Sequence, residues 1–94
     1  MKIFVVATRT GKAEDIEPHL AAEAKKALQF VAEDFFREIY SRTDGNGAVI
    51  VIEADSIEAA RQRCSELPLV AAGLLDLEFY PVGPYRGIVA LAEG

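Results

Sequence analysis

The chain has 94 residues, 51% of them hydrophobic, and a formal net charge of −5. This length fits one small domain with an apolar core of its own, and the acidic balance, with Lys and Arg scattered along the chain, argues against a nucleic-acid-binding protein. The only cysteine, Cys64, excludes an internal disulfide, and a single histidine leaves no zinc set, so we expect no metal and no cofactor.

No segment has the pattern of a targeting signal or a membrane span. Residues 1–11 are too short and turn polar too quickly for a secretory signal. No apolar stretch approaches the roughly 20 residues that a membrane-spanning helix requires. The lone cysteine also fits a reducing compartment. We therefore expect a soluble cytoplasmic protein with no membrane partner.

The chain is predicted to begin with a strand and a long helix. Residues 2–8 place apolar side chains on both faces, which is typical of a strand covered on both sides. The helix begins at Glu14 or Asp15 and runs to about residue 34, with Pro18 tolerated in its first turn. At about 100° per residue, the apolar side chains of this helix form one arc. The arc consists of Ile16, Leu20, Ala24, Ala27, Leu28 and Val31.

A β-hairpin follows the helix. Residues 35–42 form a second strand of mixed polarity, which indicates an edge strand or a cavity wall. The turn cluster at residues 44–47, D-G-N-G, joins it to residues 48–52, an apolar run rich in β-branched side chains that suits burial on both faces. Strict alternation places Phe35, Arg37 and Ile39 on one face of the second strand, and Phe36, Glu38 and Tyr40 on the other.

The second half of the chain repeats the helix–strand pattern. Asp55 and Ser56 offer cap oxygens to a helix at residues 57–67, which Pro68 ends. A short apolar connection leads to a fourth strand at residues 74–82. Its two faces are Leu75, Leu77 and Phe79 on one side, and Asp76, Glu78 and Tyr80 on the other.

The order of elements is βαββαβ, which predicts a single α+β domain over residues 1–94. The expected architecture is the ferredoxin-like sandwich, an antiparallel sheet with both helices on one face. The other sheet face is also apolar, which is rare on soluble monomers, so we expect a homodimer or higher homo-oligomer. The tail at residues 85–94 is too apolar to lie free in water, and we expect it to pack on a partner subunit or to close a pocket.

Three segments of the second half resemble a known family. They are S-I-E-A-A at residues 56–60, L-P-L at residues 67–69, and the strand that ends at Tyr80-Pro81. In these segments the chain resembles muconolactone isomerases, small proteins of aromatic catabolism that pair as dimeric α+β barrels and assemble into larger rings. The resemblance implies the same pairing and an isomerase-type reaction.

The second half is also similar to the YCII-related family, through the Gly-rich hairpin, E-A-D-S-I-E-A-A at residues 53–60 and A-G-L at residues 72–74. In that family a histidine on the first helix is a proposed active-site residue, and His19 lies at a comparable place. The acidic partner of that histidine precedes the proline after the second helix. Here the corresponding position is Leu67, so the pair is absent.

His19 and Glu23 are the candidate catalytic residues. Their spacing on a helix lets the two side chains meet, and both border the face that covers the sheet. A carboxylate at the edge of an apolar surface has a raised pKa, which suits proton transfer near neutral pH. The alternative is an ion pair at the edge of the core with no chemistry.

Arg37, Tyr40 and Tyr80 are the candidate substrate-binding residues. Arg37 and Tyr40, with Arg42, are expected to line the cleft between sheet and helix, where an arginine can hold a substrate carboxylate. Tyr80 and Tyr85 either wall the same cleft or belong to the dimer contact. The alternative for the second strand is a solvated edge with cross-strand ion pairs.

Three further residues stand out. Arg9 and Glu53 follow the first and third strands and are expected at the mouth of the cleft, or are ordinary charges at strand ends. Cys64 is on the packed face of the second helix, and we interpret it as a core residue.

These features support three hypotheses for function. The first is a cofactor-free isomerase that moves a proton within a small lactone or ketone, with His19 or Glu23 as base and Arg37 or Tyr40 as orienting group. The second is a non-catalytic oligomer that binds a small hydrophobic ligand or a partner chain. The third is a structural dimer whose cleft is filled.

Overall fold

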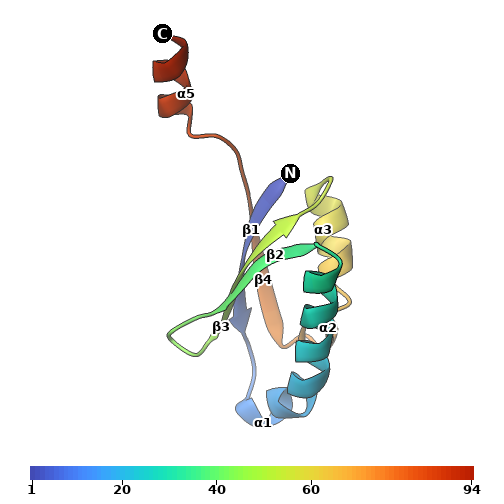
Figure 1. Cartoon of the computed structure of the whole chain (residues 1–94). Coiled ribbons are helices and arrows are strands. Elements are labelled where there is room, and N and C mark those ends of the chain that lie inside the picture. Colours follow the sequence, from blue (N-terminus) through green and yellow to red (C-terminus); the bar gives the residue numbers. More distant parts are fainter.

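A computed structural model describes all 94 residues. Figure 1 shows the arrangement of the elements. In chain order they are β1 (Lys2–Arg9), α1 (Ala13–Ile16), the 3₁₀ turn η1 (Glu17–His19), α2 (Leu20–Ala32), β2 (Phe36–Ser41), β3 (Gly47–Glu53), α3 (Ile57–Cys64), α4 (Pro68–Ala71), β4 (Leu75–Val82) and α5 (Arg86–Glu93).

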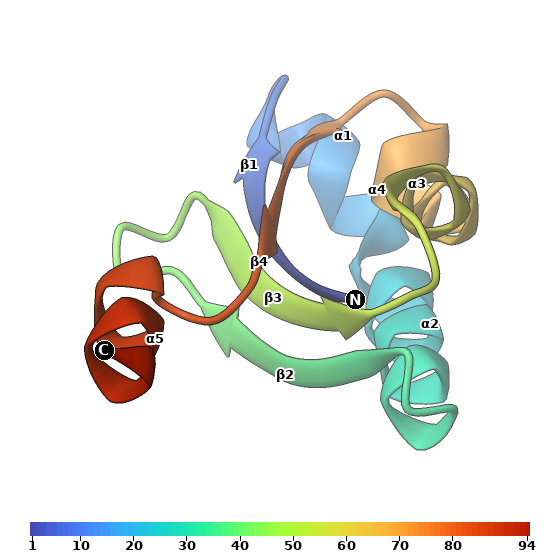
Figure 2. The same cartoon turned by 90° about the horizontal axis from the view of Figure 1, so that it is seen from above.

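The strands form one four-stranded antiparallel sheet in the order β2-β3-β1-β4. Viewed from above, α1 to α4 all lie on one side of the sheet, which we call the inner face (Figure 2). The opposite side is called the outer face. The two predicted apolar strands, β1 and β3, are the central pair. The predicted ferredoxin-like α+β fold is therefore confirmed.

Alternation along the central strands gives each face its own apolar set. On the inner face, Ile3 and Val5 of β1 are fully buried opposite Ile52 and Ile50 of β3. On the outer face, the pairs across the same two strands are Phe4 with Val51 and Val6 with Val49. The sheet thus has an apolar outer face that its own helices do not cover.

The core is centred on three phenylalanine rings between α2 and the start of β2. The ring of Phe30 lies 5.0 Å from that of Phe35 and 5.1 Å from that of Phe36, measured between centroids. The guanidinium of Arg63 lies over Phe30 and Phe35, at 4.9 and 4.3 Å from their centroids. Stacking of this kind stabilises both the rings and the cation.

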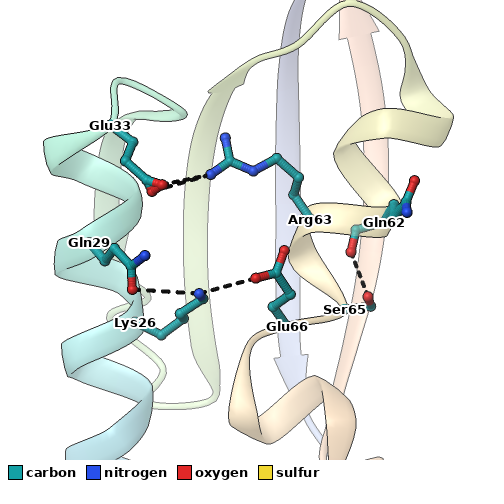
Figure 3. A network of polar contacts seen from close by, with 7 residues as sticks. All are labelled: Lys26, Gln29, Glu33, Gln62, Arg63, Ser65 and Glu66. Atoms are coloured by element: carbon teal, nitrogen blue, oxygen red, sulfur yellow. Dashed lines mark hydrogen bonds and ion pairs between the residues drawn. The ribbon is translucent and has the colours of Figure 1, made fainter.

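Polar contacts connect α2 with the α3–α4 segment (Figure 3). Arg63 pairs with Glu33 at 3.0 Å, and Lys26 pairs with Glu66 at 3.1 Å. Pairs at a surface contribute little free energy of folding. They connect α2 to the α3–α4 segment across the surface.

The first helix is not continuous, contrary to the prediction. Four residues of α1 are followed by the 3₁₀ turn, and α2 begins only at Leu20. Pro18 lies in the turn, where its ring nitrogen has no N–H to donate to an α-helical partner. The chain therefore tightens locally before the main helix starts.

The buried face of α2 also differs from the predicted arc. Leu28, placed inside the arc, is 69% exposed, whereas Phe30 is 1% exposed. Glu23, Lys26 and Ala27 are half-buried. The large ring of Phe30 decides the rotation of the helix, because burying it removes the most apolar area from water.

The predicted faces of the second strand are wrong for Phe36, which does not share a face with Glu38 and Tyr40. Phe36 pairs with Ile52, but the next paired residue, Glu38, pairs with Val51, so Arg37 forms a bulge. As a result Phe36 and Ile39 share the inner face, while Glu38 and Tyr40 share the outer face. Strict alternation could not reveal the inserted residue.

The segment after the second helix is more structured than predicted. Helix α3 ends at Cys64, and Pro68 begins the short helix α4 in the region predicted as a plain connection. Proline is favoured at this first position, where its missing N–H has no helical partner. The predicted cap is confirmed, since the Ser56 hydroxyl accepts a hydrogen bond from Ala59 N–H at 3.0 Å.

The tail contains a helix that the sequence did not predict. Helix α5 ends an arm that leads away from the sheet (Figure 1), and none of its residues is buried. It does not close a pocket of its own chain. No helix of the fold combines the length and the apolarity that crossing a membrane requires.

Candidate functional site

A pocket of about 240 Å³ lies between the inner face of the sheet and the N-terminal half of α2. It is found at the end of the sheet where β1 and β2 finish and β3 and β4 begin. Ligand pockets are commonly about 300–1,000 Å³, so this one suits a molecule of about one ring. Its polar side chains are Arg9, Glu23 and Ser41.

Small residues create the space. Ala24 and Ala27 on α2 face Ala7 and Ala48 on the central strands, and Gly47 completes this wall. Larger side chains at the other end of the same strands, around Phe30, fill the layer between helix and sheet. Along α2, β1 and β3, the apolar side chains are large at one end and small at the other. The pocket therefore follows from the sequence of these three elements.

Glu23 is the carboxylate of the pocket. Its Oε1 accepts a hydrogen bond from the backbone N–H of Leu69 at 2.9 Å, in the first turn of α4. Burial of the half-buried side chain raises the pKa of the Glu23 carboxyl, and this outweighs the Leu69 hydrogen bond and the charge of His19, which both lower that pKa. The oxygen Oε2 has no hydrogen-bond partner in the protein.

His19 lies one turn before Glu23 but does not line the pocket. It is half-buried at the end of the 3₁₀ turn, and no hydrogen bond joins it to Glu23. The predicted contact between the two side chains is absent, and His19 acts on Glu23 only through its charge, which lowers the pKa of Glu23. Leu67 stands at the position where the YCII-related family has the acidic partner of its histidine. It is buried and lines the pocket.

Arg9 contributes the positive charge of the pocket. It is the last residue of β1, and its guanidinium makes no hydrogen bond or ion pair within the chain. Its backbone N–H donates to Asn46 O at 2.9 Å, which ties the strand end to the hairpin. The sequence placed Arg9 at the mouth of the cleft, and the structure agrees.

The three predicted substrate-binding residues lie away from this pocket. Arg37 is exposed at the bulge, and its Nε donates to Asp34 O at 2.8 Å. The hydroxyls of Tyr40 and Tyr80 donate to the carboxylates of Glu38 and Glu78 on the outer face, at 2.6 and 2.8 Å. Each neighbouring carboxylate raises the pKa of its tyrosine.

Two other candidates have local roles. Arg42 donates to Thr8 Oγ1 at 2.8 Å and pairs with Asp44 at 2.6 Å, so it braces the hairpin. Glu53 pairs with the N-terminal amine at 2.7 Å, at the end of the sheet opposite the pocket. Its expected place at the cleft mouth is wrong, because β3 runs antiparallel to β1 and ends at the other side.

Cys64 is a fully buried core residue, and burial raises the pKa of its thiol to about 12. A thiol with so high a pKa is not a nucleophile at neutral pH. No group of three or more His, Cys, Asp or Glu side chains is arranged to hold a metal ion.

Comparison with known proteins identifies the fold. Muconolactone isomerase matches with a TM-score of 0.76 at 19% sequence identity, over 90% of this chain and 91% of its own. The 5-chloro-2-hydroxyhydroquinone dehydrochlorinase of Burkholderia phenoliruptrix AC1100, in complex with 2,5-dihydroxybenzoquinone, matches with a TM-score of 0.74 at 14% identity, over 93% and 98% of the two chains. The likeness to muconolactone isomerase is thus confirmed for the fold. No family model and no curated protein sequence matches the chain.

Proposed function

We propose that this protein moves a proton within a small ketone or lactone bound in the pocket, as a cofactor-free isomerase. The observation that supports it is Glu23, a half-buried carboxylate with a raised pKa in a mostly apolar pocket. Such a carboxylate is a better general base near neutral pH than an exposed one. Arg9 and Ser41 add the few polar groups that a ligand needs for orientation.

The two proteins of the same fold support this class of reaction. One is named for the isomerisation of muconolactone and the other for the dehydrochlorination of a chlorinated hydroquinone. Shifting a double bond in a lactone and eliminating HCl from a ring can both begin with removal of a proton from carbon. A carboxylate in a pocket catalyses that step.

We propose a role for each polar group of the pocket. Glu23 Oε1 is held by Leu69 N–H, so the unpartnered Oε2 takes the proton from the carbon beside the carbonyl and returns it to another carbon. Negative charge then develops on the substrate oxygen, and the Arg9 guanidinium stabilises it. Ser41 offers a second hydrogen-bond donor to the same oxygen.

His19 is the second candidate base. Its charge lowers the pKa of Glu23 against the effect of burial, so it also adjusts the base that we favour. For Arg37, Tyr40 and Tyr80 we propose a role outside the pocket. Tyr40 and Tyr80 belong to a contact between subunits.

We also propose that the protein is located in the cytoplasm.

Hydrogen–deuterium exchange tests the proposal. The protein is incubated in D₂O with unsaturated five-membered lactones and cyclic ketones, and proton NMR follows loss of the signal beside the carbonyl and any shift of the double bond. We expect Glu23→Gln to lower the rate at least ~100-fold, the lower end of a general base's contribution. Glu17→Gln, an exposed carboxylate in the preceding turn, is the control and should keep the full rate.

Two results would contradict the assignment. If Glu23→Gln keeps full activity while His19→Gln loses it, the base is His19. If the unmodified protein shows exchange with none of these compounds but binds them, the second hypothesis, a non-catalytic ligand-binding protein, is the better one. The apolar lining and the absence of an acidic residue at Leu67 favour that second function.

We also propose that two copies pair through the outer face. Phe4 is 39% exposed at its centre, and Tyr40 and Tyr80 are 57% and 49% exposed on the two edge strands, β2 and β4. A contiguous apolar surface of this kind marks an interaction site. Twofold pairing is the most common way to cover it.

A further inference from the structure

Helix α5 is amphipathic, and nothing in its own chain covers it. The side chains of Tyr85, Ile88 and Leu91 are 75%, 66% and 82% exposed. The hydrogen bonds of this segment are all local, and Figure 1 shows the helix at the far end of its arm. A helix of only eight residues is unstable by itself in water. It therefore needs a partner surface.

The pocket has apolar residues at its rim that nothing in the chain covers. Leu20 of α2 and Ile39 of the edge strand β2 both line the pocket, and they are 37% and 41% exposed. An opening between a helix and a sheet edge is a shape that accepts an amphipathic helix. Helix α5 is about 12 Å long at ~1.5 Å per residue, and its charges, Arg86 and Glu93, lie at its two ends.

The chain cannot place α5 on its own pocket. Arg9, Ser41 and Leu75 line the pocket, so it lies at the start of β4, whereas α5 follows the end of β4. Strand β4 spans about 26 Å at ~3.3 Å per residue. The connecting residues 83–85 reach about 10 Å at most. A helix α5 that covers this pocket must therefore come from another molecule.

We infer that α5 of a second copy of this chain lies across the mouth of the pocket, with Ile88 and Leu91 packed against Leu20 and Ile39. The pocket that contains Glu23 is then completed by two chains. Covering the mouth excludes water from the carboxylate and encloses the bound molecule. The outer face is the competing site for α5, but it is a broad sheet surface that fits another sheet better than a single helix.

Disulfide trapping tests the placement. Single-cysteine additions Ile39→Cys and Leu91→Cys are made in chains with different affinity tags, co-expressed, and oxidised with copper phenanthroline. The native Cys64 stays in place, because burial raises its thiol pKa to about 12 and keeps it unreactive. Tyr80→Cys combined with Leu91→Cys is the matched control on the outer face. Non-reducing gels and peptide mass spectrometry identify the linked residues.

We expect a disulfide between residues 39 and 91 of differently tagged chains, and little or none between residues 80 and 91. Linkage of residue 91 to residue 80 alone, or no linkage at all, would overturn the inference. The inference concerns the pocket of the proposed function, but trapping reports position alone. Its failure is therefore distinct from an absence of isomerase activity.

Alkylation provides a second measurement. No residue of helix α5 is buried, and Leu91 is 82% exposed, so Leu91→Asp should leave the body folded, which circular dichroism checks. The cysteine of Ile39→Cys should react with iodoacetamide several-fold faster when Leu91→Asp is added. The cysteine of Tyr80→Cys should react at an unchanged rate. Equal rates at residue 39 with and without Leu91→Asp would contradict a cover made by α5.

Discussion

Glu23 shows how one side chain can serve the fold and the site together. One carboxylate oxygen takes the place of a cap for α4, by accepting the hydrogen bond of Leu69 N–H. The other oxygen is left free beside an apolar pocket. The hydrogen bond holds the carboxylate in position. Burial disfavours its charged form, which raises the pKa of Glu23 and makes the carboxylate more basic.

The raised pKa predicts the pH dependence of activity. As the proposed base, Glu23 would accept a proton only when it is ionised, so the exchange rate should rise with pH and level off above the pKa of this residue. We expect the midpoint to lie above 4.5, the ordinary value for the group. A pH–rate profile measured by NMR checks this, with Glu17→Gln as control. A midpoint at or below that value would contradict the role of burial.

The same shift predicts a change in stability. Because the pKa of Glu23 is raised in the folded state, its favourable contribution to folding is present below the ordinary value of 4.5 and is lost as the pH rises through the raised pKa. Glutamine keeps an acceptor for Leu69 N–H and carries no charge. Glu23→Gln should therefore stabilise the fold at pH 7.

We expect a gain of less than about 1 kcal/mol, because water screens a half-exposed group. Urea unfolding at neutral pH and near pH 4 measures it, and the difference between the two proteins should shrink at the lower pH. A loss of stability at neutral pH would mean that the charged hydrogen bond outweighs burial.

At the scale of elements, the β2–β3 hairpin shapes the end of the sheet at which the pocket lies. Asp44 accepts a hydrogen bond from Asn46 N–H at 2.9 Å, which closes the predicted turn. Gly45 and Gly47 both have positive φ, at 74° and 144°. A side chain at Gly47 would also place its Cβ 1.9 Å from Ala7 O, so here the strands approach too closely for any other residue.

Gly47→Ala should therefore destabilise the fold by more than ~2 kcal/mol, since it combines a steric clash with an unfavourable φ. Gly45→Ala is the matched control, because that position has positive φ and open space. We expect it to cost about 1 kcal/mol, the price of the left-handed conformation alone. Urea unfolding of both variants checks the difference, and equal losses would contradict the close approach to Ala7.

The packing of α2 explains where the pocket can form. Phe30 and the cations of Lys26 and Arg63 lock the C-terminal half of this helix against the core and α3. The N-terminal half presents Ala24 and Ala27 to the sheet and leaves space there. The C-terminal half of α2 therefore fills the space above the sheet, whereas its N-terminal half leaves the pocket.

At the scale of the whole molecule, two apolar features lack a partner within the chain. They are the outer face of the sheet and the helix α5, which lies at one extreme of a molecule 56 Å long and 27 Å wide. Burial of apolar area drives association. A chain with both features is expected to assemble, and the two contacts use different surfaces.

Phe4→Gln should weaken the proposed pairing through the outer face, because Phe4 is at its centre, opposite Val51 on one side and Tyr80 on the other. Sedimentation velocity should show a shift toward smaller species relative to the unmodified protein. Leu28→Gln is the control, since Leu28 is 69% exposed on α2, on the other side of the sheet. An unchanged assembly in Phe4→Gln, with the fold verified by circular dichroism, would exclude this face.

The sequence by itself determined the order of the four strands and the two main helices, the hairpin turn, the Ser56 cap and the apolar character of both faces of the central strands. These follow from periodicity and local hydrogen bonding, which act between residues close in the chain. It also identified Glu23 and Arg9 before the pocket was known. The bulge at Arg37 escaped prediction, because an inserted residue changes no local pattern.

Only the tertiary structure decided how these parts meet. The hydrogen bond from Leu69 to Glu23 joins residues 46 positions apart, and the rotation of α2 depends on Phe35 and Phe36 beyond its end. Antiparallel pairing moved Glu53 away from the pocket, and the bulge put Tyr40 on the outer face. Such outcomes depend on packing between distant segments, whose geometry no local pattern specifies.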